Sequence, residues 1–287
     1  MDTIDLATIF KRFRLLISGT LSLLFIENIV IVLYPYLVGL TITDLLDGQY
    51  RMLTIIGATF GFHLFVGVLR RVYDTRVYSK IYAVVASELV DAQRSGGDSD
   101  SEIVARVEML RELVDFFEHD LPNGLMSVSS LFGAVIMLGI LDWRISLLCL
   151  GAMIFLGVVY GLSQRTIASA NRSLNDAYEH QMNIICKAGR PRVRAYFHIL
   201  RGRAVWLSDL DAGLSAALEM VLIGVFVSAL LLATTGGNPT PGPIVAIMTY
   251  VFEFYGSMMF FPYLLQQKTR LSDISGRLGS EKRDALT

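Results

Sequence analysis

Six apolar segments constrain the fold of this chain more than any other feature of its sequence. They lie near residues 15–38, 53–69, 121–141, 145–162, 219–235 and 244–265. Each is close to the ~20 residues that an α-helix needs to cross the hydrocarbon core of a bilayer. The sequence therefore predicts an all-α, polytopic membrane protein with six transmembrane helices.

The distribution of Lys and Arg predicts how these helices are oriented. With a cytoplasmic N-terminus, only Arg51 and Arg144 of the 25 basic residues face the outer side of the membrane. Basic residues near the ends of spans favour the cytoplasmic side. We therefore expect a multi-pass protein of the inner or plasma membrane with both termini in the cytoplasm. The net charge of −1 gives no reason to expect a nucleic-acid partner, and membrane lipid is the expected surrounding.

The two ends of the chain are predicted to lie outside the membrane. In residues 1–14, apolar and charged side chains alternate as in a short amphipathic (elbow) helix at the inner membrane surface, with a disordered tail as the alternative. We assign residues 15–280 to a single six-helix transmembrane domain and residues 281–287 to a short cytoplasmic tail. Cys149 and Cys186 lie too far apart in this topology for a disulfide, and both are interpreted as packing residues.

The connections between the apolar segments differ greatly in length. The outer turns are short, whereas the inner connections, residues 70–120 and 163–218, are long and carry apolar residues at helical spacing. In the first of them these are Val104, Val107, Leu110, Val114, Phe117 and Leu121. We therefore expect the membrane helices to continue into the cytoplasm; one from Arg144 to about Lys187 would be roughly 60 Å long, about twice the hydrocarbon thickness.

Gly and Pro residues divide each inner connection into two helices that meet at a hairpin tip. The tips fall near residues 95–104 and 188–195. They are positioned to touch a cytoplasmic partner, although a turn of this kind also serves simply to reverse the chain.

In this order, the segments resemble the six-helix transmembrane domain of ABC exporters, the type IV (type I exporter) fold. Residues 99–113 (SDSEIVARVEMLREL) are similar to the first coupling segment of that family, and residues 184–197 (IICKAGRPRVRAYF) to the second. Residues 142–147 (DWRISL) match its outer turn between the third and fourth helices, and residues 270–278 (RLSDISGRL) the end of its last helix. The resemblance implies a homodimer, or a heterodimer with a related half, and it implies contact with an ATPase through Ser99, Asp100, Glu102, Gly189, Arg190, Arg192 and Arg194.

The sequence contains neither a G-x-x-x-x-G-K-[ST] phosphate-binding loop nor a Leu-Ser-Gly-Gly-Gln signature. We therefore expect no enzymatic activity and no cofactor in this chain, with ATP and Mg²⁺ bound by a separate nucleotide-binding subunit. The predicted function is that of a membrane-spanning subunit of an ABC-type transporter, forming half of a dimeric translocation pathway. No metal site is predicted, because the spacing of the scattered residues His63, His119, His180 and His198 suits no zinc site.

Two other functions remain open. An ATPase-free, proton-coupled transporter of the same fold would need titratable groups within the membrane, and the sequence offers four: Glu253, Glu27, His63 and Glu219. Glu253 is the best of them, because small and polar residues lie one turn away, but it also suits a neutral, hydrogen-bonded acid. Glu27 also suits a polar link between helices, and His63 a packing role. The third function is a non-transporting membrane scaffold.

Overall fold

The computed structural model describes residues 11–96, 99–179, 181–187, 189–235 and 240–260. Six helical stretches in these ranges are long and apolar enough to cross a membrane, which confirms the predicted number of spans. The chain separates into two compact units, residues 1–141 with 236–287 and residues 142–235. We call these the first and second units and describe each by itself. Most of the predicted amphipathic helix at residues 1–14, and the tail at 281–287, lie outside the described residues.

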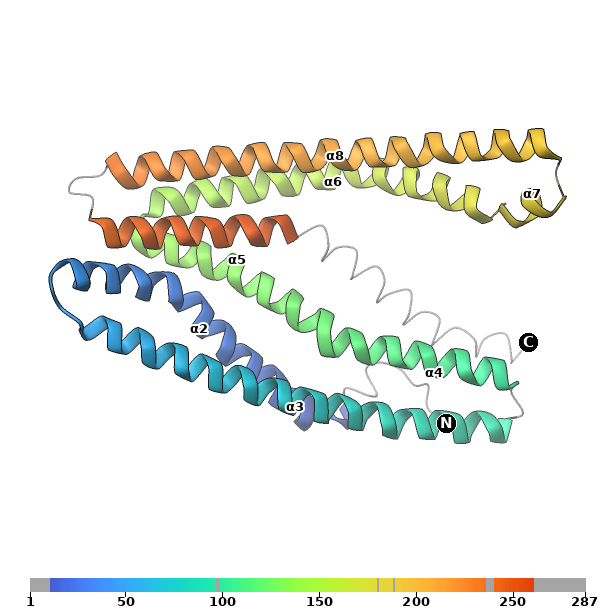
Figure 1. The fold of residues 1–287 in the computed structure, drawn as a ribbon, viewed down its shortest axis with the longest axis horizontal. Coiled ribbons are helices and arrows are strands. Elements are labelled where there is room, and N and C mark those ends of the chain that lie inside the picture. Colours follow the sequence, from blue (N-terminus) through green and yellow to red (C-terminus); the bar gives the residue numbers. More distant parts are fainter. Residues whose placement is uncertain (1–10, 97–98, 180, 188, 236–239, 261–287) are drawn as a thin grey trace. The chain divides into compact units, whose positions relative to one another are not determined.

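The first unit contains α2 (Arg14–Leu46), α3 (Arg51–Gly96), α4 (Asp100–Asp115), the π-helical turn η1 (Phe116–Asp120), α5 (Leu121–Leu141) and the helix Pro241–Phe260. A tight turn joins α2 to α3, which pack as an antiparallel pair (Figure 1). Gly48 closes this turn at a φ of 73°, a conformation that L side chains rarely adopt. With 46 residues, α3 is about 69 Å long, more than twice the ~30 Å hydrocarbon core. The predicted extension of this membrane helix is thus confirmed.

The extended parts of α3 and α4 pack through a hydrophobic core of their own. Its buried members, which include Ile17 of α2, are Ile17, Val77, Tyr78, Ile81, Val85, Leu89, Leu110, Leu113 and Val114. The prediction that Val104 belongs to this face is wrong, because its side chain is 60% exposed and that of Ile103 is only 7% exposed. Residues 103, 107, 110, 114 and 117 follow helical steps of four and three, so the buried stripe begins one residue earlier than predicted.

Where the extension meets the apolar part, the backbone widens into the π-helical turn η1. The sequence pattern predicted an uninterrupted helix through Asp120. Pro122 lies two residues after Asp120, and its nitrogen carries no hydrogen to donate to the carbonyl of Glu118. A π-turn at this point accommodates the missing bond without ending the helix.

Small residues let α2 and the helix Pro241–Phe260 approach closely. A Cβ added to Gly39 would lie 2.6 Å from the carbonyl oxygen of Gly242 and 2.8 Å from the Cβ of Ala246. The hydroxyl of Tyr250, which is 1% exposed, donates to the carbonyl of Val32 at 2.7 Å. This bond falls one turn before Pro35, where α2 lacks a backbone donor. Close backbones and an interhelical hydrogen bond are typical of helix packing in membranes.

The second unit is a long helical hairpin. It consists of α6 (Trp143–Glu179), α7 (Gln181–Lys187) and α8 (Arg190–Thr235), and α6 and α8 pack along each other. The continuous helix predicted from Arg144 to Lys187 is described in two parts, since residue 180 lies outside the described residues. Cys149 is fully buried, as predicted for a packing residue, but Cys186 is exposed on the short helix α7, so its predicted packing role is wrong.

Candidate functional site

The first hairpin tip joins α3 to α4 and is locally capped. The carboxylate of Glu102 accepts hydrogen bonds from the hydroxyl of Ser99 at 2.7 Å and from the backbone N–H of Ser99 at 3.0 Å. These bonds, the hydroxyl bond above all, hold the pKa of Glu102 below its ordinary value. Asp100 and Glu102 lie in the first turn of α4, where the helix dipole favours negative charge. The start of α4 therefore presents an exposed, acidic surface at this tip.

The second hairpin tip joins α7 to α8 and has the opposite charge. The carbonyl of Gly189 accepts the N–H groups of Arg192 at 3.0 Å and of Val193 at 3.2 Å, which starts the helix. Arg190, Arg192 and Arg194 are exposed within its first five residues, and its first turn contains no acidic residue. Because a helix N-terminus already carries positive potential, these guanidinium groups add to that potential. An acidic surface placed against this tip would offset it.

A buried ion cluster lies between α2 and α3 in the first unit. The Nε of Arg70 donates to Glu27, and its Nη1 donates to Asp74 at 2.9 Å. The side chains of Glu27, Arg70 and Asp74 are only 12%, 16% and 5% exposed. A Cβ on Gly67 would lie 3.1 Å from the Glu27 carboxylate, so this glycine leaves room for the carboxylate. The sequence pattern placed Arg70 at the start of the first inner connection, residues 70–120, and did not predict its contact with Glu27.

His63 belongs to the same cluster. Its Nε2 lies 3.8 Å from Glu27 Oε1, and its ring stacks on Tyr34 with 5.3 Å between ring centroids. The buried Nδ1 has no hydrogen-bond partner within the described part of the chain. Packing against Tyr34 accounts for the position of the ring. The Nδ1 atom is left as an available donor or acceptor beside the Glu27–Arg70 pair.

Glu253 lies on the helix Pro241–Phe260 and lines a small cavity inside the first unit. The cavity holds about 10 Å³, close to the space of one water molecule, and Pro35, Ser130 and Tyr250 also line it. Phe252, the preceding residue, is 60% exposed. The carboxyl group therefore faces the interior of the unit. Glu219 has a different setting, because it is exposed on α8 in the second unit.

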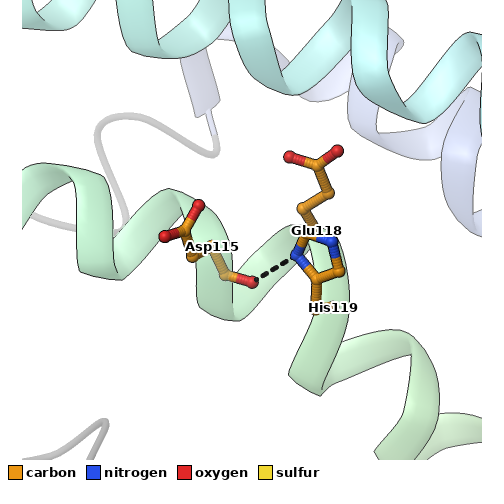
Figure 2. Close-up of side chains that lie close together, drawn as sticks. All are labelled: Asp115, Glu118 and His119. Carbon is orange, nitrogen blue, oxygen red and sulfur yellow. Dashed lines mark hydrogen bonds between the residues drawn. The ribbon is translucent and has the colours of Figure 1, made fainter.

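Figure 2 shows a further group of polar side chains, Asp115, Glu118 and His119, around the π-helical turn. Their carboxylate and imidazole atoms lie within 4.8 Å of one another, and the His119 Nδ1 is 3.3 Å from the backbone oxygen of Asp115. Ligands that share one Zn²⁺ in tetrahedral geometry are roughly 3.4 Å apart. The carboxylates of Asp115 and Glu118 extend in different directions (Figure 2), so we assign no metal to this group.

Taken together, these features define a polytopic helical membrane protein whose long helices carry charged hairpin tips well beyond their apolar segments. The family model described as the ABC transporter transmembrane region matches residues 6–242. The chain therefore belongs to this family, as the order of its segments indicated. The matched region is the membrane part of such transporters and is not itself catalytic. Among curated proteins, none matches the chain closely enough to count as a relative.

Proposed function

We propose that this chain is the membrane-spanning subunit of an ABC-type transporter that acts with a separate ATPase chain. Two six-helix units would form one translocation pathway, as a homodimer or with a related half. Both termini and both hairpin tips would face the cytoplasm. Membership of the ABC transporter transmembrane family supports the transport role.

The observation that carries the proposal is the length of the helices relative to the bilayer. Both α3 and α8 contain 46 residues, so each is about 69 Å long and extends some 39 Å beyond a ~30 Å hydrocarbon core. The extension of α3 is held by its own hydrophobic core with α4. A motion imposed on a packed extension of this kind would be passed to the membrane part of the same helices.

The charges of the tips favour an ATPase partner with complementary patches. Asp100 and Glu102 make the first tip acidic, while Arg190, Arg192 and Arg194 make the second one basic. Charge complementarity at an interface chiefly gives specificity and a fast association rate. Two tips of opposite sign would therefore fix both the identity and the orientation of the partner.

Site-specific photocrosslinking in native membranes tests this proposal. A photoreactive amino acid replaces Asp100 or Arg192 at the tips, and replaces Tyr50 in the opposite turn as the matched control. Tyr50 is 68% exposed, so the control position is also accessible. We expect the tip positions to capture a polypeptide with a phosphate-binding loop, and position 50 not to capture it. The proposal fails if the tips capture no such protein or if all three positions capture the same one.

A second candidate function, ion-driven transport without an ATPase, is favoured by the position of Glu253 beside a water-sized cavity. A carboxyl group that faces a cavity within a membrane protein is a candidate for carrying a proton. In proteoliposomes, proton-driven uptake that Glu253→Gln abolishes would support this function. Glu179→Gln is the matched control, because Glu179 is exposed on α6 beyond its apolar segment. Equal uptake by wild type and Glu253→Gln would exclude proton transfer through this residue.

A further inference from the structure

The second unit contains a large cavity between α6 and α8 that is open to the surface and about 840 Å³ in volume. Charged residues line it from both helices, with Arg165, Arg172 and Asp176 on α6 and Arg203 on α8. The other α6 residues that line it are small and leave the space open: Ala168, Ser169, Ser173 and Ala177. The volume falls within the range of ~300–1,000 Å³ that is typical of small-molecule sites.

Two hydrogen bonds hold the walls of the cavity together. The hydroxyl of Tyr196, which is 8% exposed, donates to the carbonyl of Ala177 at 2.6 Å. The Nη1 of Arg203 donates to the carbonyl of Ser173 at 2.5 Å. Both bonds cross from α8 to α6, so the separation of the two helices is fixed where the cavity lies. The site is therefore preformed and does not need to open around a ligand.

The charge of the lining selects anions. Three guanidinium groups and one carboxylate leave two positive charges in excess on the walls. Arg165 and Arg172 are two helical turns apart on α6, about 10 Å along the axis, so they face the same cavity from different depths. Guanidinium groups bind phosphate oxygens through paired, charge-assisted hydrogen bonds. A ligand with at least two negative charges on phosphate groups matches this lining.

The depth of the cavity identifies two possible sources of such a ligand. The apolar segment of α6 ends near Leu162, which places Arg165 about 5 Å and Arg172 about 15 Å beyond it. The headgroup layer of a bilayer is roughly 5–8 Å thick on each side. The cavity therefore starts at the level of the lipid headgroups and continues into the aqueous phase.

We propose that this cavity is a binding site for a phosphate-bearing anion with at least two negative charges. A phospholipid headgroup that enters from the membrane and a soluble phosphate compound that enters from the tip side share this chemistry. The assignment rests on the arginines and the cavity alone and does not depend on the proposed function.

Two binding measurements on the full chain distinguish these sources. In the first, inorganic pyrophosphate is titrated by calorimetry into the protein in a neutral detergent. In the second, native mass spectrometry counts phosphatidic acid retained from nanodiscs of phosphatidylcholine that contain this lipid. We expect saturable binding in one of the two measurements, weakened by added salt because charged contacts are screened. If the ligand is a soluble phosphate compound, pyrophosphate binds in the first measurement. If it is a lipid headgroup, only the second measurement shows binding, as retained phosphatidic acid.

Arg172→Gln and Arg201→Gln form the matched pair of variants. Each removes one guanidinium from the second unit, but Arg172 lines the cavity, whereas Arg201 is exposed on α8 outside it. We expect Arg172→Gln to weaken binding about tenfold and Arg201→Gln to leave it within about twofold. Arg203 is kept, because it also links the two helices. No saturable binding in either measurement, or equal weakening by both variants, overturns the assignment.

Discussion

Replacing Arg70 by Met should destabilise the first unit more than any other single change in the ion cluster. Arg70 is the one cation that contacts both Glu27 and Asp74 among the described residues, and all three side chains are largely buried. Its removal takes the shared guanidinium away from two buried carboxylates. Breaking a buried ion pair from one side typically costs about 3–5 kcal/mol. Glu27→Gln should cost less, about 1–3 kcal/mol, since Arg70 keeps Asp74 and the new amide oxygen can still accept its N–H.

The assay is chemical unfolding of the full chain in detergent, followed by circular dichroism, for both variants. Arg71→Met is the matched control, because Arg71 is the next residue of α3 and is exposed. We expect this control to change the free energy of unfolding by no more than about 0.5 kcal/mol. The reasoning is refuted if Arg70→Met costs no more than Glu27→Gln, or if it matches the Arg71 control.

Three further predictions test separate parts of the structure. Gly242→Ala should lower stability by about 1–3 kcal/mol, because the added Cβ would overlap Thr43 Oγ1 and the backbone carbonyl oxygen of Gly39. Gly256→Ala on the same helix meets open space and should not lower stability, since alanine favours a helix over glycine by up to about 1 kcal/mol. Thermal melting in detergent compares the two variants. The lowered pKa of Glu102 means that its bond to Ser99 stabilises α4 above the unfolded-state pKa of about 4.3 and is lost as the pH falls through the folded-state value. The protection of the first turn of α4 against hydrogen exchange, corrected for the intrinsic exchange rate at each pH, should therefore fall on acidification in wild type and stay unchanged in Glu102→Gln. An impermeant maleimide should label the exposed Cys186 in inside-out vesicles but not in intact cells; labelling of intact cells would contradict the proposed orientation.

Hydropathy and helical periodicity were sufficient to predict the architecture of this chain. The six apolar stretches and the extended helices depend on local pattern, and the structure contains them. Local pattern failed where a neighbouring element decides the outcome. Ile103 replaces Val104 on the buried stripe because α3 selects the face of α4 that packs. Cys186 is exposed on the short helix α7, and the residues around it in the sequence do not indicate which face of that helix is buried.

The ion cluster could have been found from the sequence by a geometric argument about the hairpin. Glu27 lies twenty residues before Asp47, and Arg70 lies twenty residues after Tyr50, on either side of the tight turn between α2 and α3. Residues equally distant from the turn of an antiparallel helical pair share the same depth. Tyr34 and His63 obey the same relation, thirteen residues from the turn on each side, and their rings stack.

Depth alone, however, does not place two side chains on facing sides of their helices. Whether Arg70 turns toward α2 or toward lipid depends on the rotation of α3, which its contacts with α2 and α4 determine. Gly67 gives the decisive clue, because it removes a side chain at the point where the Glu27 carboxylate approaches α3. A glycine one turn from an arginine at the end of an apolar segment, opposite a carboxylate of equal depth, is a pattern that predicts a buried pair. Gly67→Ala should therefore weaken the Glu27–Arg70 contact, so that Arg70→Met costs less free energy of unfolding in the Gly67→Ala background than in wild type. In the Gly61→Ala background, where the added Cβ meets open space, Arg70→Met should cost as much as in wild type.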